Sequence, residues 1–161
     1  MAIYLDANVF YNAYCPIEER FISDWVLRQL TPNFPGLTSE WTIAEMFRAF
    51  KKQINLERIE QKDAQLALNL FLSEIGEYIQ RNEIILIPVK MSLIMASRPL
   101  IYEANFYAAD AVHLTTAMQA NADAFITFDG HFSTFTKILV LNPKDKNFKS
   151  KINQMKANSQ D

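Results

Sequence analysis

Short apolar runs alternate with amphipathic segments along this chain, and the alternation limits the folds that the chain can adopt. Four of the runs are too short for helices and consist largely of strand-forming residues: 2–5, 84–89, 124–127 and 138–141. The segments between them carry apolar residues at helical spacing. Strands that alternate with helices form a mostly parallel sheet covered on both faces. The sequence therefore predicts an α/β fold of three layers, with a mostly parallel sheet between helices.

The helical segments are expected at residues 18–30, from Thr42 onward, at 56–80, at 92–103 and at 109–121. Pro32, Pro35 and Gly36 end the first of them. Pro99 must kink or interrupt the segment at 92–103. The buried face of the longest segment is predicted to consist of Leu66, Leu70, Phe71, Ile75, Tyr78 and Ile79.

The length and composition fit one domain. A chain of 161 residues, half of them hydrophobic, can fold without a disulfide or a structural metal. Its single cysteine, Cys15, excludes a disulfide within the chain. No apolar stretch reaches the roughly 18 residues of a membrane-spanning helix, and no basic segment precedes an apolar one at the N-terminus. We expect a cytoplasmic protein without membrane association.

Charge is distributed unevenly along the chain. Lysine and arginine number 16 against 18 acidic residues, which argues against a nucleic-acid binder that depends on bulk positive charge. From residue 137 onward, however, the sequence contains six lysines and only two aspartates. We therefore expect a domain over residues 1–141 and a lysine-rich polar tail over 142–161. With three glycines and no glycine-rich loop, the chain lacks the nucleotide-binding loops of the Walker and dinucleotide types.

Four carboxylates fall at connections of the predicted sheet. Asp6 follows the first apolar run, Asp129 comes shortly after the run at 124–127, and Asp110 opens the helix that leads into that run. Glu45 lies in the first turn of the helix expected from Thr42. Ligands of open parallel sheets bind beyond the carboxyl ends of the strands. The four acids could therefore converge at one edge of the sheet.

Each acid also has an ordinary structural explanation. Asp6 could form an Asx turn at the end of a strand, and an aspartate followed by glycine, as at Asp129, is typical of a turn. Asp110 is a natural N-cap for its helix, and Glu45 completes a capping box with Thr42. No single acid requires a function, so the functional interpretation depends on all four lying at the same edge.

The pattern as a whole resembles the PIN-domain family, specifically the VapC-type toxins of toxin–antitoxin systems. The matching stretches are YLDANVF at residues 4–10, ADAVHLTTA at 109–117 and ADAFITFDGHF at 122–132, and Glu45 fits the remaining acid of that family. The resemblance spans residues 1–141. It implies a five-stranded parallel sheet flanked by helices, and a metal-dependent endoribonuclease activity.

The chemistry of the four acids agrees with that resemblance. Clustered carboxylates without a counter-ion cannot all stay ionised, because like charges raise one another's pKa. Oxygen ligands without clustered histidine or cysteine favour Mg²⁺, or Mn²⁺, over zinc. We expect Asp6 and Asp110 to be the central ligands and Glu45 and Asp129 to complete the metal site, which would also be the catalytic site. The reaction would be the in-line attack of a metal-activated water on an RNA phosphodiester.

Other residues near these acids are assigned supporting roles. Asn8 and Thr127 could orient Asp6 or contact phosphate, with local turn hydrogen bonds as the alternative. Arg48 could contact RNA phosphates, with a solvated helix end as the alternative. His113 is interpreted as a packed helix residue rather than a ligand, and His131 as a solvated one.

The resemblance also implies partners: an RNA substrate, a cognate antitoxin and a second copy of the chain in a homodimer. Met46, Phe47 and Phe50 are predicted as core, although some of them could line a groove for the antitoxin. The main alternative is a catalytically silent PIN-like module that binds RNA or protein. An Mg²⁺-dependent phosphatase or a receiver domain fits less well, because the former would need aspartate at Asn8 and the latter a lysine after its last strand.

Overall fold

The computed structural model describes residues 1–18 and 20–159. Five strands form one sheet in the order β3-β2-β1-β4-β5, and every neighbouring pair is parallel. The strands are β1 (Ile3–Leu5), β2 (Gly36–Ser39), β3 (Ile84–Ile87), β4 (Ala124–Ile126) and β5 (Leu139–Leu141). The predicted α/β fold with a parallel sheet between helices is confirmed.

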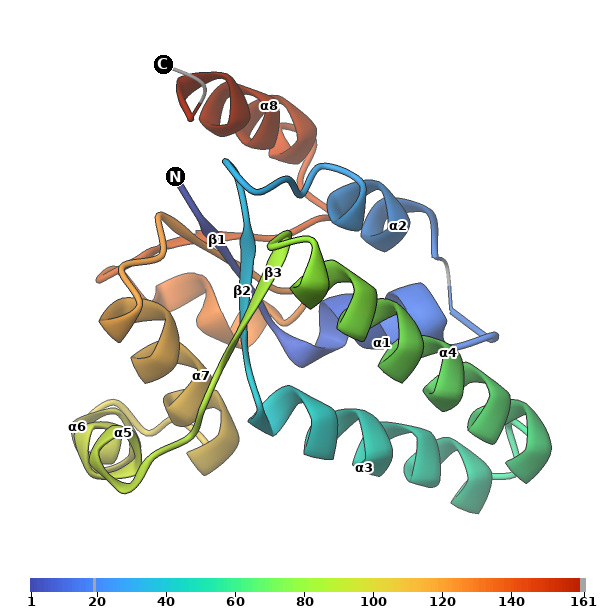
Figure 1. Ribbon diagram of the computed structural model, residues 1–161. Coiled ribbons are helices and arrows are strands. Elements are labelled where there is room, and N and C mark those ends of the chain that lie inside the picture. The colour runs from blue at the N-terminus through green and yellow to red at the C-terminus, as the bar shows by residue number, and fades with distance from the viewer. Residues whose placement is uncertain (19, 160–161) are drawn as a thin grey trace.

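Helices cover both faces of this sheet (Figure 1). One face is covered by α1 (Ala7–Tyr14), α2 (Phe21–Leu27), α3 (Trp41–Asn55), α4 (Gln61–Gln80) and α8 (Phe148–Asn158). The other is covered by α6 (Arg98–Tyr102), α7 (Ala108–Gln119) and the 3₁₀ helix η1 (Gly130–Thr134), with α5 (Met91–Ala96) beside α7. None of the helices that the structure describes is long and apolar enough to span a membrane.

The pleat of β1 divides the interior into two cores. Ile3 and Leu5 are buried in the core formed with α1 to α4 and α8, whereas Tyr4 points into the core formed with α7. Adjacent strand residues face opposite sides of a sheet, so a three-residue strand contributes to both cores. In the second core the Tyr4 ring stacks on Phe125 of β4, with ring centroids 5.2 Å apart. β1 is therefore fixed on both faces directly before Asp6.

Helix α1 and strand β2 were not predicted from the residue pattern. α1 begins directly after β1, where the Asp6 side chain accepts a hydrogen bond from Ala7 N and caps the helix. β2 begins at Gly36, which the sequence indicated only as a helix breaker. A Cβ atom at this glycine would lie 3.0 Å from side-chain atoms of Leu5 and Leu30, so close packing explains its presence there.

The long helical segment expected at 56–80 contains one helix, α4, which begins later than expected, and residues 56–60 form the turn after α3. α3 continues to Asn55, and a turn with Glu57 at a φ of 56° leads into α4 at Gln61. Of the predicted buried face, Phe71 and Ile75 are buried, but Leu66 is 59% exposed and Leu70 is also exposed.

Two further details of the predicted helices are settled by the structure. Met46 and Phe50 belong to the core, whereas Phe47 is exposed. The break expected at Pro99 is confirmed, since α5 and α6 are separated at Ser97 and Pro99 lies in the first turn of α6.

Much of the expected polar tail is a packed helix. Phe148, Ile152 and Met155 of α8 are buried in the same core as β1, and the Phe148 ring contacts Trp25 of α2 edge to face. The Lys149 ammonium lies 5.2 Å from the centre of the Trp25 ring. Residues 160–161 of the expected tail lie outside the described residues. α8 thus packs onto the domain by its apolar side and keeps its lysines on the surface.

Candidate functional site

The sheet has a topological switch point between β1 and β4. The chain runs from β1 through β2 to β3 at one edge, and β4 and β5 then extend the sheet on the other side of β1. Ligands bind at the carboxyl ends of the strands where the strand order reverses in this way. β1 is the central strand here, whereas a receiver domain has its first strand next to an edge strand. This order therefore excludes the receiver domain considered above.

Asp6, directly after β1, is held by three donors. Its Oδ1 accepts from Ala7 N at 2.7 Å, and its Oδ2 accepts from the Thr127 hydroxyl and from Asn8 Nδ2, both at 2.6 Å. The side chain is buried. A carboxylate with this many donors has one fixed orientation.

Asn8 and Thr127 connect the two loops that follow β1 and β4. Asn8 Nδ2 donates to Thr127 Oγ1 at 2.9 Å, and Asn8 Oδ1 accepts from Phe128 N at 3.0 Å. The Thr127 hydroxyl also accepts from Asp129 N at 3.0 Å. Because 119 to 121 residues separate the partners in the contacts between the loops, the alternative of purely local turn bonds is wrong. The two residues orient Asp6 as expected, while a contact of theirs with phosphate stays a prediction.

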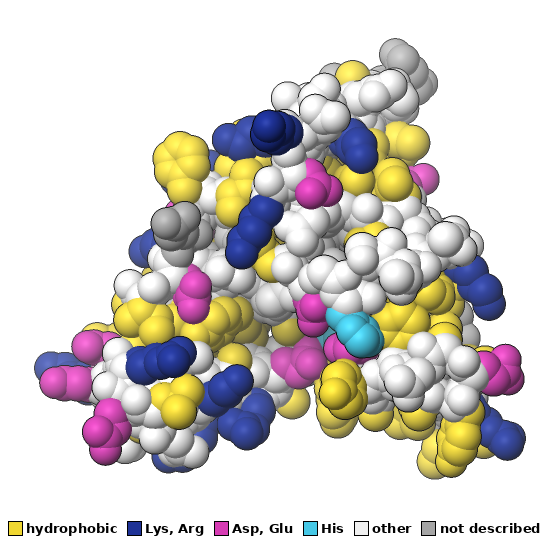
Figure 2. Space-filling view, turned by 180° about the vertical axis from the view of Figure 1, so that it is seen from behind, with side chains coloured by type: hydrophobic (Ala, Val, Ile, Leu, Met, Phe, Trp, Pro, Cys, Tyr) yellow, Lys and Arg dark blue, Asp and Glu magenta, His cyan; other side chains and the backbone are white. Residues whose placement is uncertain are grey.

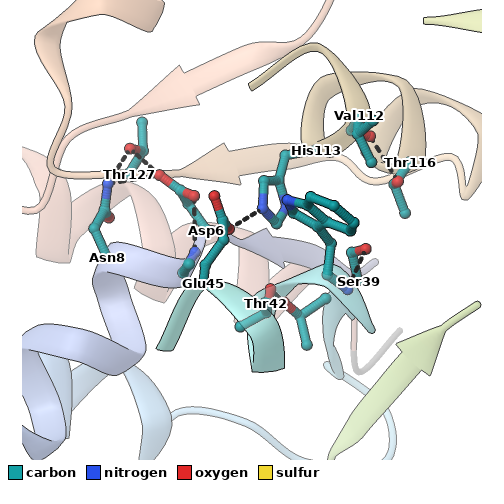
Figure 3. Close-up of polar contacts among 12 residues, drawn as sticks. Asp6, Asn8, Ser39, Thr42, Glu45, Val112, His113, Thr116 and Thr127 are labelled. Atoms are coloured by element: carbon teal, nitrogen blue, oxygen red, sulfur yellow. Dashed lines mark hydrogen bonds and ion pairs between the residues drawn. The ribbon is translucent and has the colours of Figure 1, made fainter. Parts of the chain in front are cut away.

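Glu45 on α3 is joined to His113 on α7 (Figure 3). His113 Nε2 hydrogen-bonds Glu45 Oε2, and His113 Nδ1 hydrogen-bonds the Tyr4 hydroxyl at 2.7 Å. His113 is 1% exposed. In a neutral ring, Tyr4 donates to Nδ1 and Nε2–H donates to Glu45. His113 is a packed helix residue as predicted, but sequence reasoning missed its contact with the candidate site.

The capping roles suggested for Glu45 and Asp110 are wrong. α3 begins at Trp41 with Glu40 in the N-cap position, and the Thr42 hydroxyl pairs with Thr38 at 2.8 Å instead of closing a capping box. α7 begins at Ala108 after Tyr107, so Asp110 lies in the first turn and is not the N-cap. Neither acid is needed to cap its helix, which leaves both free for another role.

Asp129 has the turn role suggested for it. Its Oδ1 accepts from His131 N at 2.8 Å and caps η1. The Asp129 side chain is exposed nonetheless. A cap and a functional ligand can therefore be the same residue here.

All four acids line one pocket of about 310 Å³ at the carboxyl ends of β1 and β4. Figure 2 shows acidic side chains gathered around a hollow in this face, with an exposed histidine beside them. The lining residues are Asp6, Ala7, Asn8, Tyr11, Glu45, Met46, Arg48, Ala49, Lys52, Asp110, Asp129 and Phe132. Arg48 and Lys52 thus place two positive charges on the α3 wall of an otherwise acidic pocket. The convergence that the sequence suggested is present in the structure.

The carboxylates raise one another's affinity for protons. Burial, together with the charges of Asp6, Asp129 and Glu45, raises the pKa of Asp110 to about 6. Burial also raises the pKa of Asp6, although the His113 charge and the Thr127 hydroxyl act in the opposite direction. The pocket therefore concentrates negative charge that a cation would stabilise.

The donor set fits a divalent cation. Ligand atoms of Asp6 and Glu45 lie within 4.8 Å of each other, and Asp110 and Asp129 line the same pocket. His113 is equally near, but Glu45 and Tyr4 engage both of its ring nitrogens. Carboxylate oxygens dominate this set, which favours Mg²⁺ or Mn²⁺. The only sequence signal for His113 was its position three residues after Asp110, which places both on one side of α7.

Comparisons with known proteins agree with the fold. A family model for the PIN domain matches residues 3–138. FitAcB from Neisseria gonorrhoeae superimposes with a TM-score of 0.60 at 21% identity, covering 88% of this chain and 97% of that chain. VapBC2 from Rickettsia felis, bound to a DNA fragment from its promoter, superimposes with a TM-score of 0.59 at 16% identity, covering 88% of this chain and 98% of that chain. VapC20 from Mycobacterium tuberculosis, a toxin that cleaves the sarcin-ricin loop, superimposes with a TM-score of 0.60 at 15% identity, covering 85% of this chain and 98% of that chain. A comparison with curated proteins gave no match.

Proposed function

The chain belongs to the PIN domain family, and from this premise we propose that it is a metal-dependent endoribonuclease, the toxin of a toxin–antitoxin pair. The observation that carries the proposal is the convergence of Asp6, Glu45, Asp110 and Asp129 on one pocket at the switch point of the sheet. Acids placed merely for local capping would not need to share a pocket. The toxin–antitoxin complexes among the similar structures support the second part of the proposal.

The four acids would hold Mg²⁺ or Mn²⁺. A bound divalent cation would lower the pKa of a water nucleophile and stabilise the charge that develops on the phosphate oxygens. Asp6 is suited to be the central ligand because its orientation is fixed by Thr127, Asn8 and Ala7 N before any ion binds. Asp110 would be the second central ligand, since burial and the neighbouring carboxylates both raise its pKa, and a bound ion would stabilise its ionised form.

Glu45 and Asp129 would orient the attacking water and accept its proton. His113 occupies Oε2 of Glu45 and fixes that carboxylate, so Oε1 is the oxygen suited to accept a proton from the attacking water. Asp129 is fixed in the same way, because its Oδ1 accepts from His131 N and its Oδ2 remains to orient the water. In each of the two acids, one carboxylate oxygen would thus be held by a hydrogen bond from the protein, and the other would be available to the attacking water.

Arg48 and Lys52 would bind the RNA backbone. They lie one helical turn apart on α3 and line the same pocket as the acids. Phosphate contacts of this type position a nucleic acid without reading its sequence. A phosphate between this wall and the acids would have its charge balanced from both sides.

We also propose an antitoxin partner and a homodimer. Phe47 on α3 and Leu66 and Leu70 on α4 are large apolar side chains on the surface. The two helices pack against each other, and apolar residues exposed on paired helices would suit a protein partner. A short reading frame directly upstream, whose product copurifies with this chain and inhibits RNA cleavage, would support the antitoxin. Light scattering of the purified chain alone would give its oligomeric state.

Calorimetric titration of the metal-free protein with Mn²⁺ tests the metal site. We expect saturable binding by the wild type and its loss in Asp6→Asn and Asp110→Asn, with folding verified by circular dichroism. Asp63→Asn is the matched control, because Asp63 occupies the same first-turn position in α4 as Asp110 in α7 but is exposed. RNA cleavage in Mn²⁺ by the wild type, and not by the two site variants, would then establish the activity. Folded wild type that binds no metal would contradict the proposal and favour the catalytically silent module.

A further inference from the structure

Two aromatic rings that the proposed reaction does not use lie on the surface beside the acidic pocket. Tyr107 is 77% exposed, and His131 is exposed as well. Their ring centroids are 6.3 Å apart and the ring planes are tilted by 31°. His131 follows Asp129, which lines the acidic pocket, by two residues.

Both rings are fixed relative to the acids. Tyr107 occupies the N-cap position of α7, three residues before Asp110. His131 N donates to Asp129 Oδ1, so the backbone of His131 is bonded to a candidate ligand. These connections place the backbones of both residues next to acids that line the pocket.

A buried aromatic residue supports the His131 ring from below. The Phe106 ring contacts the His131 ring edge to face, with centroids 5.7 Å apart, and it stacks on buried Phe132 of η1 at 5.8 Å. Phe106 itself belongs to the second core. The His131 ring therefore rests on packed side chains, which limits its movement and reduces the entropy lost when a ligand stacks on it.

We propose that Tyr107 and His131 form a stacking platform for an unpaired nucleobase next to the phosphate bound in the acidic pocket. This inference rests on the proposed function. Tyrosine and histidine rings are typical surfaces on which proteins stack the unpaired bases of RNA. A base inside a duplex has both faces covered by its neighbours and cannot use such a platform.

The charge of the neighbouring groups favours a nucleobase as the occupant. The faces of nucleobases are uncharged, so a base can lie beside Asp110 and Asp129 without repulsion, while its phosphate lies toward Arg48 and Lys52 on the α3 wall. Stacking on aromatic side chains tolerates any base, because every base has a π-face. The platform would thus select for strandedness more than for sequence.

The test compares the affinities of Tyr107→Ala and the wild type for RNA in the presence of Ca²⁺. The probes are a fluorescein-labelled single-stranded 15-nucleotide RNA of mixed sequence and the same RNA paired with its complement, measured by fluorescence anisotropy. Loss of one stacked base lowers affinity by about tenfold. We therefore expect Tyr107→Ala to bind the single strand about tenfold more weakly, with duplex binding unchanged and Tyr107→Phe close to the wild type.

Tyr102→Ala is the matched control, because Tyr102 is 81% exposed but its ring lies against the Arg98 guanidinium of α6, whereas the Tyr107 ring is paired with His131. Equal affinities of Tyr107→Ala and the wild type for the single strand would overturn the platform, as would an equal loss for both probes. Cleavage assays in Mn²⁺ separate this result from the proposed function. If the wild type cleaves RNA but Tyr107→Ala binds RNA as tightly as the wild type, the platform is refuted and the nuclease proposal stands. If Tyr107→Ala binds the single strand more weakly but the wild type cleaves no RNA, the nuclease proposal is refuted and the platform stands.

Discussion

His113 and Glu45 are hydrogen-bonded to each other although 68 residues separate them in the sequence. The bond joins α7 to α3, the helices that carry Asp110 and Glu45, and the Tyr4 hydroxyl holds the other nitrogen of the same ring at 2.7 Å. The orientation of a candidate ligand therefore depends on a buried chain of contacts that begins in the central strand. Residues that orient metal ligands in this way contribute to metal affinity without touching the ion.

Replacing His113 should impair the site more than the fold. His113→Leu keeps most of the volume but frees the Glu45 carboxylate, and we expect a loss of about 10- to 100-fold in Mn²⁺ affinity or RNA cleavage. The Tyr4 hydroxyl would lose its partner, which should lower the free energy of unfolding by about 1–3 kcal/mol. Tyr4→Phe is the milder comparison, since it leaves the contact between His113 and Glu45 intact. Full activity of a folded His113→Leu variant would show that Glu45 needs no such support.

Thr127 should matter through its hydroxyl and not through its size. Thr127→Val removes the donor to Asp6 Oδ2 and the acceptor for Asp129 N while preserving the shape of the side chain. We expect a loss of about 1–3 kcal/mol in unfolding free energy, measured in urea, because the buried Asp6 carboxylate loses one of its three donors and Asn8 Nδ2 loses an acceptor. Thr127→Ser keeps the hydroxyl and should stay near the wild type. Equal stabilities of Thr127→Val and Thr127→Ser would show that the hydrogen bonds of the Thr127 hydroxyl do not stabilise this loop.

The stability of the metal-free protein should fall as the pH rises from about 4 to 7. The pKa of Asp110 is raised from its usual 3.8 to about 6, so in this range the native state holds a proton that the unfolded state has released. Raising the pH removes that proton and leaves a carboxylate among other carboxylates. The pKa of Asp6 is also raised, so Asp6 acts in the same direction over this range. The raised pKa of His113 lowers stability in the same way, but only above its usual value of 6.5.

Asp110→Asn should therefore stabilise the metal-free protein at pH 8. After allowance for solvent screening we expect a gain of about 1–2 kcal/mol, or roughly 2–8 °C in Tm, and a smaller gain at pH 5. Asp63→Asn has the opposite expectation, a slight loss, because it only removes a favourable charge from the first turn of α4. Thermal unfolding in EDTA at both pH values provides the comparison. An Asp110→Asn variant less stable than the wild type at pH 8 would contradict crowding of like charges in the pocket.

The sequence predicted those parts of the site that follow from local patterns. β1 and β4 are short apolar runs with clear ends, so the positions of Asp6 and Asp129 after them could be identified directly. β2 was missed because its four residues, glycine, leucine, threonine and serine, include one large apolar side chain. Pairing with β1 and β3 on both sides and the bond from the Thr38 hydroxyl to Leu5 O stabilise this strand, and these contacts are tertiary.

His113 shows the corresponding limit for the site. Its distance from Asp110 could be read from helical periodicity, but its contact with Glu45 depends on how α7 packs beside α3. No periodicity carries that information. The same limit applies to the convergence of the four acids, which required the order of the strands and not only their positions in the chain.

Phe148 should anchor α8 to the domain. Its ring is buried against Trp25 of α2, and its charged neighbours led to the expectation of a polar tail. Phe148→Ala leaves a cavity in that core, and we expect a loss of about 3–5 kcal/mol in unfolding free energy, measured in urea. Phe21→Ala is the matched control, because Phe21 is 80% exposed under Lys149 and its removal should change stability by no more than about 0.5 kcal/mol. Equal effects of the two changes would mean that α8 contributes nothing to the core.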